Sequence, residues 1–204
     1  MSENPQEAKI KFVLISQMGQ LGFLDKAIKE IESDYGLKLG IKSYILNILE
    51  RTSEKLEDLK NAIYQTDFLL LDIRGNSPVI EFLVATLKEL KIEHPDKYSR
   101  MSIIALVAGN SEIRSLTKLG KFDASKIPAS KDRVDYMNEI PDLSAMVKKG
   151  MKMTDIMKTL GKLIPIGLLK DANKWVNCME YWVNGYGGFP ENHKYLLLYL
   201  LKNY

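Results

Sequence analysis

Short apolar runs alternate with helical patterns through the first half of this chain, and this rhythm restricts the fold more than any other feature. Two of the runs are apolar throughout and end in polar residues, which is typical of strands buried on both faces of a parallel sheet. The expected strands are Ile10–Ser16, Leu37–Ile45, Asp67–Asp72 and Ser102–Ala108. The expected helices between them are Leu21–Tyr35, Ser53–Gln65 and Pro78–Glu93, with Ser77 as the N-cap of the last.

Strands joined by helical crossovers predict an α/β fold, here a flavodoxin-like parallel sheet of about four strands in the order 2-1-3-4. The strand pattern stops near residue 111, and we expect a loop at residues 120–130. The remainder predicts helices at Ser111–Leu119, Val134–Lys148, Thr154–Leu163, Leu168–Val183 and Glu191–Lys202. We therefore expect a flavodoxin-like domain at 1–113 and a mostly helical extension at 114–204, packed on the sheet domain and continuing beyond residue 204.

Composition and charge restrict the surroundings in which the chain works. The chain is 46% hydrophobic, enough to bury a core, but no apolar stretch reaches the length of a membrane span. Cys178 is the only cysteine and reads as a buried structural thiol, and no signal peptide precedes the first strand, so we expect a cytoplasmic protein. Residues 114–174 hold 13 Lys and Arg against 7 Asp and Glu. Without interleaved aromatics, this predicts a solvated helical face or a docking surface for an acidic partner subunit, not a nucleic-acid site.

Polar, glycine-containing loops follow three of the expected strands, at the edge where open α/β sheets bind ligands. These loops contribute Ser16, Asp72, Arg74 and Asn110 as candidate substrate-binding residues. Arg74 is the sharpest candidate, because a guanidinium at a strand end can grip a carboxylate with two parallel hydrogen bonds. The alternative is structural, with Arg74 pairing with Asp72 or capping loop carbonyls.

Other kinds of site fit the sequence less well. Asp72 is placed like the phosphoacceptor of a receiver domain, but Ser16-Gln17 stands where an acidic pair for Mg²⁺ is needed. Neither a Walker A motif nor a G-x-G-x-x-G fingerprint occurs, so a nucleotide site has little support. His94 and His193 are isolated from other ligating residues, and we expect neither a metal site nor catalytic residues in this chain.

The last thirty residues are rich in aromatic side chains and end in an apolar helix. Tyr195–Leu201 is almost wholly apolar. Such a helix needs cover on most sides, so we expect an interface to sequence beyond residue 204 or a dimer through this helix. The aromatic residues are expected to form a core or that interface, and less readily to stack on a flat macrocycle. They are Trp175, Tyr181, Trp182, Tyr186, Phe189, Tyr195 and Tyr199.

Several motifs, taken in their order along the chain, resemble a known family. They are Leu70-Leu71-Asp72-Ile73-Arg74-Gly75, then Leu160-Gly161-Lys162-Leu163-Ile164-Pro165-Ile166-Gly167 with Lys170-Asp171-Ala172, then Tyr181-Trp182, Gly187-Gly188, Glu191-Asn192 and Leu196-Leu197-Leu198-Tyr199-Leu200. These stretches are similar to segments near the N-terminus of the large subunits of ATP-dependent tetrapyrrole metal chelatases. Those subunits are the cobaltochelatase CobN subunit and the H subunit of magnesium chelatase.

The resemblance implies that the full subunit handles a tetrapyrrole substrate and a divalent metal, cobalt or magnesium. It also implies partner subunits of the AAA+ ATPase type, which hydrolyse ATP to drive insertion. Insertion must remove pyrrole protons and calls for a base beside the ring, and no residue of this chain reads as that base. The chain would then be a non-catalytic module, without a cofactor of its own, for macrocycle binding, a lid or ATPase docking. The alternative is a stand-alone flavodoxin-like interaction or sensory module.

Overall fold

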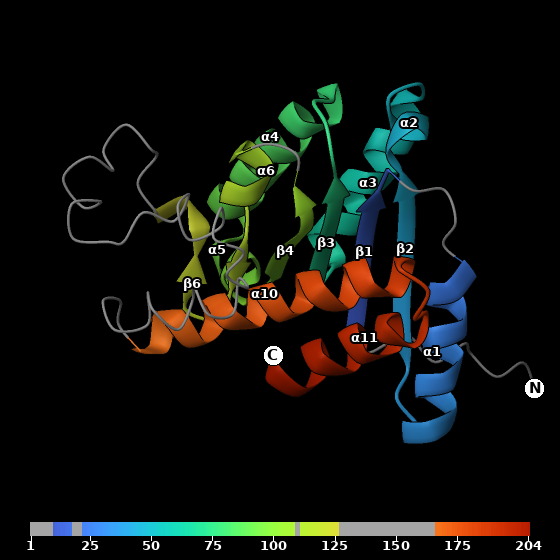
Figure 1. Cartoon of the computed structure of the whole chain (residues 1–204). Helices are drawn as coiled ribbons and strands as arrows, with labels where there is room; N and C mark the ends of the chain where they lie inside the picture. Colours follow the sequence, from blue (N-terminus) through green and yellow to red (C-terminus); the bar gives the residue numbers. More distant parts are fainter. Residues whose placement is uncertain (1–9, 18–21, 109–110, 127–165) are drawn as a thin grey trace, which may run out of the picture.

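The computed structural model describes residues 10–17, 22–108, 111–126 and 166–204, which form an α/β fold around one sheet. The sheet has six strands in the order β2-β1-β3-β4-β5-β6 (Figure 1). The first four are parallel, and their order confirms the predicted 2-1-3-4 arrangement. The strands are β1 (Ile10–Ser16), β2 (Leu39–Ile45), β3 (Phe68–Ile73), β4 (Ser102–Ala108), β5 (Lys118–Leu119) and β6 (Phe122–Asp123).

The last two strands are missing from the sequence-based prediction, and the expected loop at 120–130 is wrong in its first part. β5 pairs antiparallel with both β4 and β6, and Gly120 turns the chain between β5 and β6 with a φ of 58°. Each of these strands is only two residues long, which is too short for an alternating pattern to be visible. The helix expected at Ser111–Leu119 ends at Ser115, because the residues from Lys118 onward join the sheet instead.

Helices join the strands and cover both faces of the sheet. They are α1 (Gly22–Tyr35), α2 (Leu46–Leu49), α3 (Ser53–Gln65), α4 (Pro78–Glu93), α5 (Pro95–Arg100), α6 (Ser111–Ser115), a 3-10 turn (Ala124–Lys126), α10 (Ile166–Tyr186) and α11 (Glu191–Asn203). Ser77 caps α4 as predicted, since its hydroxyl oxygen accepts a hydrogen bond from the Val79 N–H at 3.2 Å. The sequence misses the short helices α2 and α5. Two predicted helices, Val134–Lys148 and Thr154–Leu163, lie outside the described residues.

Side chains alternate between the two faces of the parallel strands, and each face has its own core. On one face the strands pack against α3 and α4, through residues such as Ile15 and Leu71. On the other face they pack against α1, α10 and α11, through residues such as Leu14 and Leu70. The sheet therefore lies between two helical layers, and α10 crosses the strands on the second face (Figure 1). Every side chain of β3 is buried, which explains why its sequence reads as a continuous apolar run.

The leucines of α11 are buried within the chain. Leu196, Leu197 and Leu200 have no solvent exposure and belong to the core that α11 shares with α1 and α10. On the outer side, Lys194 Nζ joins α11 to α1 through Asp34 at 2.7 Å and Glu30 at 3.2 Å. These three leucines are therefore covered within the chain, and a dimer through this helix stays a prediction. Their cover comes from α10 and from α1, and α1 is too remote in the sequence for a local pattern to reveal it.

Residues on both sides of the expected boundary at residue 113 build the same sheet, since β5 pairs with β4. Trp175 ties α10 to β4, because its Nε1–H donates a hydrogen bond to the Ala105 carbonyl oxygen at 2.8 Å. The division into 1–113 and 114–204 stays a prediction.

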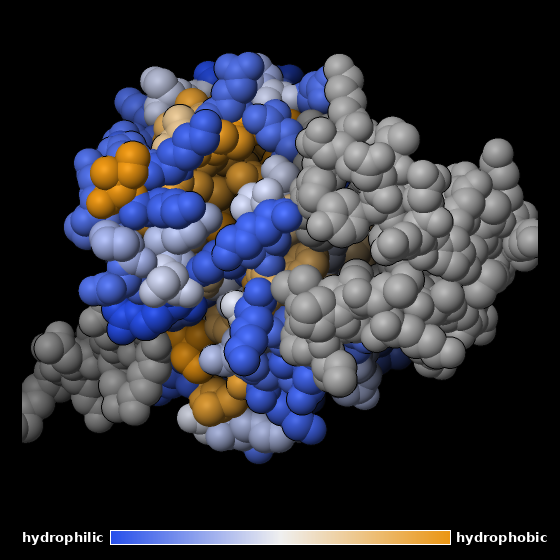
Figure 2. Space-filling model, turned by 90° about the vertical axis from the view of Figure 1, so that its left-hand side faces the viewer, coloured by the Kyte–Doolittle hydropathy of each residue, from blue (hydrophilic) through white to orange (hydrophobic). Residues whose placement is uncertain are grey.

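The surface on the β6 side of the sheet is mostly hydrophilic where it is described, and hydrophobic residues show mainly in the gaps between hydrophilic ones (Figure 2). This pattern is that of an ordinary solvated face. Among the described residues, no helix combines the length and the apolar character that a membrane span requires.

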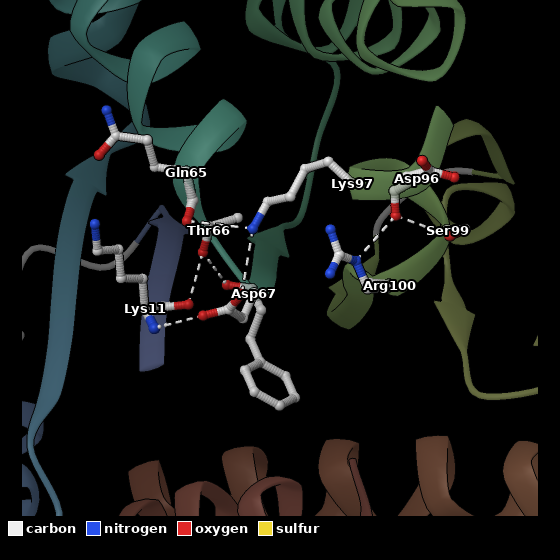
Figure 3. A network of polar contacts seen from close by, with 9 residues as sticks. Lys11, Gln65, Thr66, Asp67, Asp96, Lys97, Ser99 and Arg100 are labelled. Atoms are coloured by element: carbon white, nitrogen blue, oxygen red, sulfur yellow. Dashed lines mark hydrogen bonds and ion pairs between the residues drawn. The ribbon is translucent and has the colours of Figure 1, made fainter. Parts of the chain in front are cut away.

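A polar network closes the amino-terminal edge of the sheet (Figure 3). One carboxylate oxygen of Asp67 accepts a hydrogen bond from the Lys11 backbone N–H at 2.9 Å, and the other lies 3.2 Å from Lys97 Nζ on α5. The buried Thr66 hydroxyl lies 2.9 Å from the carbonyl oxygens of both Lys11 and Phe68. These contacts join β1, β3 and α5, so this edge has a structural task. The opposite, carboxyl-terminal edge is where a ligand site is expected.

Candidate functional site

Two of the predicted site residues meet at the carboxyl-terminal edge of the sheet. Ser16 ends β1 and is the register partner of Asp72 in β3, because neighbouring parallel strands end at the same edge. Both side chains are fully buried, and the Ser16 hydroxyl donates a hydrogen bond to Asp72 Oδ2 at 3.1 Å. The pairing of β3 with β4 shifts register between Leu71 and Asp72. Such irregularities re-aim side chains and are frequent beside functional sites.

Arg74 extends this pair toward solvent. Its Nε–H donates to Asp72 Oδ1 at 3.2 Å, while 45% of its side chain is exposed. Its backbone N–H donates to Gln17 Oε1 at 3.2 Å, and the Gln17 N–H donates to the Asp72 carbonyl oxygen at 3.0 Å. Among the described residues, the terminal amino groups of Arg74 make no hydrogen bond. The structural pairing with Asp72 is thus present, and it leaves the outer side of the guanidinium open.

Asn110, the fourth predicted site residue, lies outside the described residues. The site that the structure brings together therefore consists of Ser16, Asp72 and Arg74. A phosphoacceptor role for Asp72 is opposed by its complete burial, because an in-line phosphoryl donor must reach the carboxylate oxygen. The nearby N-terminus of α4 caps itself: the N–H groups of Val79 and Ile80 bond to the Ser77 hydroxyl and carbonyl oxygens.

An aromatic cluster joins three helices of the layer on the second face of the sheet. It consists of Phe23 from α1, Trp182 and Tyr186 from α10, and His193 from α11. The His193 ring stacks on Phe23 at 3.9 Å between centroids and meets Trp182 and Tyr186 edge to face at 5.1 and 5.3 Å. Gly185 makes this packing possible, because a Cβ atom there would collide with the His193 ring.

Tyr186 belongs to the aromatic cluster, and the polar residues at the strand ends influence its pKa. Burial raises the pKa of Tyr186 to about 12, the Ser16 hydroxyl lowers it, the Asp72 carboxylate raises it and the Arg74 guanidinium lowers it. The phenol remains protonated at neutral pH, so it can donate a hydrogen bond.

His193 is neutral in this setting. Burial lowers the pKa of His193, and the contact of Nδ1 with the Pro190 carbonyl oxygen at 3.1 Å opposes that shift. A carbonyl oxygen can only accept, so Nδ1 carries the proton and Nε2 presents a lone pair. Three buried polar atoms of the cluster lack a hydrogen-bond partner among the described residues: Trp182 Nε1, the Tyr186 hydroxyl and His193 Nε2. Buried polar atoms are rarely left in this state without a reason.

The sequence analysis named several of these residues, but it did not predict which of them lie together in the fold. Trp182 and Tyr186 appeared in an aromatic group assigned to a core or interface, and His193 appeared isolated. Phe23 carried no signal at all. The one available clue is Gly185 close to Gly187 and Gly188, since such a turn permits close backbone approach to a neighbouring ring.

Other candidate chemistry is weaker. Cys178 is fully buried, as predicted, and burial raises its pKa to about 12, so its reactive thiolate is not available at neutral pH. In the described ranges, no group of three or more His, Cys, Asp or Glu residues is placed to hold a metal ion. A groove of about 220 Å³ on the α10–α11 hairpin, lined by Asn177, Glu180, Tyr181, Asn184 and Asn192, does not include the strand-end residues.

Comparison with known proteins identifies the family of the chain. No curated protein matches it. A protein-family profile, described as a domain of unknown function, matches residues 10–176, which include all six strands of the sheet, the strand-end residues and the first half of α10. The chain therefore belongs to the family described as "domain of unknown function" (DUF3479).

Proposed function

We propose that this chain is an N-terminal module of a cobaltochelatase- or magnesium-chelatase-like large subunit, acting in the cytoplasm. The family to which it belongs is known from the N-terminal regions of CobN and magnesium chelatase subunits, in line with the resemblance of the sequence motifs. In this role the module helps to bind the tetrapyrrole substrate for metal insertion. ATP hydrolysis belongs to AAA+ partner subunits, and the cobalt or magnesium ion is the cargo of the full complex.

The observation that carries the proposal is the arrangement of Asp72 and Arg74. A fully buried carboxylate holds Nε of an arginine whose side chain is 45% exposed, at the edge of the sheet where ligands of this fold class bind. Holding one side of the guanidinium orients its terminal amino groups toward solvent. That geometry suits bidentate recognition of a carboxylate, and the acetate and propionate groups of tetrapyrroles are carboxylates.

Metal insertion itself is assigned to another part of the subunit. The step needs a base that reaches the pyrrole N–H groups of a bound ring. His193 has a free lone pair, but it is only 1% exposed and enclosed by Phe23, Trp182 and Tyr186. The module therefore acts as a carboxylate-recognising contact for the macrocycle.

A fluorescence titration of the whole chain with metal-free uroporphyrin, a porphyrin polycarboxylate, tests this function. The fully methyl-esterified porphyrin has the same ring without ionised carboxylates. We expect saturable binding of the acid and at least tenfold weaker binding of the ester. Arg74→Ala should weaken binding of the acid about tenfold or more, because a hydrogen-bonded charge pair contributes roughly 1.5–3 kcal/mol.

Arg100→Ala is the matched control, because Arg100 precedes β4 at the opposite edge of the sheet and is exposed. It should leave the affinity unchanged. Equal binding of acid and ester, or equal effects of the two arginine substitutions, would contradict the proposal.

Docking of a partner subunit is the second candidate function. Val183 and Phe189 lie at the corner between α10 and α11 and are 53% and 59% exposed. Large apolar side chains at one exposed corner favour a protein contact. The same chain with Phe189→Ser should then lose association with the ATPase subunit, whereas Tyr35→Ser, at an equally exposed aromatic residue on α1, should not.

A further inference from the structure

The side chain of Gln17 meets Arg74 at the carboxyl-terminal edge of the sheet. Gln17 directly follows the last residue of β1 and is exposed. Its side-chain oxygen Oε1 accepts a hydrogen bond from the Arg74 backbone N–H at 3.2 Å, and its own backbone N–H donates to the Asp72 carbonyl oxygen at 3.0 Å. These two bonds run in opposite directions between the same two strand ends, so Gln17 and Arg74 are held side by side.

The hydrogen bond to Arg74 also settles which end of the Gln17 amide faces the arginine backbone. A backbone N–H can only donate, so the atom that it meets is the amide oxygen and not the amide nitrogen. The nitrogen Nε2 is bonded to the same carbon and carries two donor hydrogens, and it makes no hydrogen bond with the described residues. Gln17 and Arg74 therefore both carry unused donors at one exposed place on the sheet edge.

We propose that Gln17 is a second ligand-contacting residue, whose amide nitrogen donates a hydrogen bond to the same carboxylate that Arg74 grips. This inference rests on the proposed function and adds a residue that the sequence-based prediction of the site leaves out. A carboxylate has more acceptor positions than one guanidinium fills, so a further donor fits it. Because the amide is exposed, a ligand can reach it from solvent, and because its oxygen is already bonded, its orientation costs little further ordering.

Gln17→Met tests the inference, because methionine has a similar length and no N–H donor in its side chain. Gln65→Met is the matched control, since Gln65 is an exposed glutamine that ends α3 at the opposite edge of the sheet (Figure 3). The probe is metal-free uroporphyrin with the whole chain, and its methyl ester is the comparison ligand. We expect Gln17→Met to raise the Kd of the acid about five- to tenfold and Gln65→Met to leave it unchanged. Unchanged affinity of Gln17→Met for the acid would overturn the inference.

A double-mutant cycle separates direct contact from an effect through Arg74. Gln17→Met also removes the acceptor of the Arg74 backbone N–H, so it could weaken binding merely by displacing the arginine. If Gln17 touches the ligand itself, Gln17→Met should weaken binding of the acid severalfold in the Arg74→Ala background as well. If Gln17→Met has no further effect once Arg74 is removed, Gln17 only positions the arginine and the inference is overturned.

Unfolding in urea and the ester ligand separate a binding role from a structural one. The hydrogen bond between Gln17 and Arg74 is exposed, so water can replace the amide oxygen, and the urea midpoint of Gln17→Met should stay close to that of the unaltered chain. A lower midpoint together with equal weakening of acid and ester binding would overturn the inference, because a damaged fold rather than a lost carboxylate contact would then be responsible.

Arg74→Ala distinguishes this inference from the function beneath it. If Arg74→Ala weakens binding of the acid and Gln17→Met does not, the proposed function stands and the inference falls. If the unaltered chain does not bind uroporphyrin at all, both fall.

Discussion

At the scale of single residues, Asp72 orients the proposed ligand-binding arginine. Asp72→Asn keeps the shape of the side chain and an acceptor for Ser16, but it removes the charge that holds Arg74 Nε. Because the Arg74 side chain is 45% exposed and can turn into water, we expect stability to fall by only about 1 kcal/mol. The Kd of the porphyrin acid should rise severalfold.

Asp34→Asn provides the control, since Asp34 is exposed and pairs with Lys194 on the helical layer. If both asparagine variants bind the porphyrin acid as tightly as the unaltered chain, Asp72 does not contribute to ligand binding.

The lowered pKa of His193 leads to a prediction of how the stability of the fold depends on pH. Burial lowers the pKa of His193 in the folded chain, so the unfolded chain takes up a proton first, near its ordinary value of about 6.5. Stability is therefore full above that value and falls as the pH drops below it. The slope approaches about 1.4 kcal/mol per pH unit until the folded pKa is reached.

Urea unfolding between pH 5 and 7.5, above the range in which carboxylates titrate, measures this effect. His193→Gln should flatten the profile, whereas His94→Gln, at the end of α4, should not. A slope that survives in His193→Gln would mean that another group is responsible.

At the scale of elements, the sequence predicts well whatever depends on local pattern. β1, β4, α3 and α4 match their predicted bounds, because continuous apolar runs and the Ser77–Pro78 cap are local signals. The sequence does not predict β5 and β6, because a strand of two residues is too short to show an alternating hydrophobic pattern. The burial of the α11 leucines is not predictable for a different reason, since they pack in one core with α1 and the strands through contacts that no local window contains.

The burial of α11 gives a prediction about two adjacent residues. Leu196 is fully buried, whereas Tyr195 beside it is 49% exposed. Leu196→Ala should therefore cost about 2–5 kcal/mol of unfolding free energy, and Tyr195→Ala about 0.5 kcal/mol or less. Denaturant unfolding of the two variants decides the matter. Comparable losses would mean that α11 is not packed as described.

The packing at the corner between α10 and α11 requires a residue without a side chain at position 185. A Cβ at Gly185 would collide with the His193 ring, so Gly185→Ala must displace it from Phe23 and Trp182. We expect a loss of about 1–3 kcal/mol, measured by thermal or urea unfolding. Gly75→Ala, where nothing lies within 4 Å of the new Cβ, should be nearly neutral. A neutral Gly185→Ala would show that the His193 ring yields easily.

At the scale of the whole molecule, the two edges of the sheet have different tasks. Asp67 joins β1, β3 and α5 at the amino-terminal edge, whereas Arg74 faces solvent at the carboxyl-terminal edge. Asp67→Ala should lower stability by roughly 1–3 kcal/mol, because it leaves a strand N–H without its acceptor, and it should leave porphyrin affinity unchanged. Arg74→Ala should lower porphyrin affinity, and it should also cost some stability, because it leaves the buried Asp72 carboxylate without its charged partner. Affinity and unfolding measured on both variants check the contrast.

Sequence reasoning finds one half of the candidate site. Ser16, Asp72 and Arg74 are predictable because parallel strands deliver their carboxyl-terminal residues to one edge. The packing of Tyr186 against Phe23 is not predictable, because more than a hundred residues separate them in the chain.

Hydrogen–deuterium exchange of the whole chain, with and without saturating porphyrin acid, tests the central claim most directly. Carboxylate binding at the strand ends predicts slower exchange in the segments around Gln17 and Arg74–Ser77. Exchange around Thr66–Asp67 and in α5, at the opposite edge, should stay unchanged. Protection confined to that opposite edge, or absent from Arg74–Ser77, would contradict the assignment of the site.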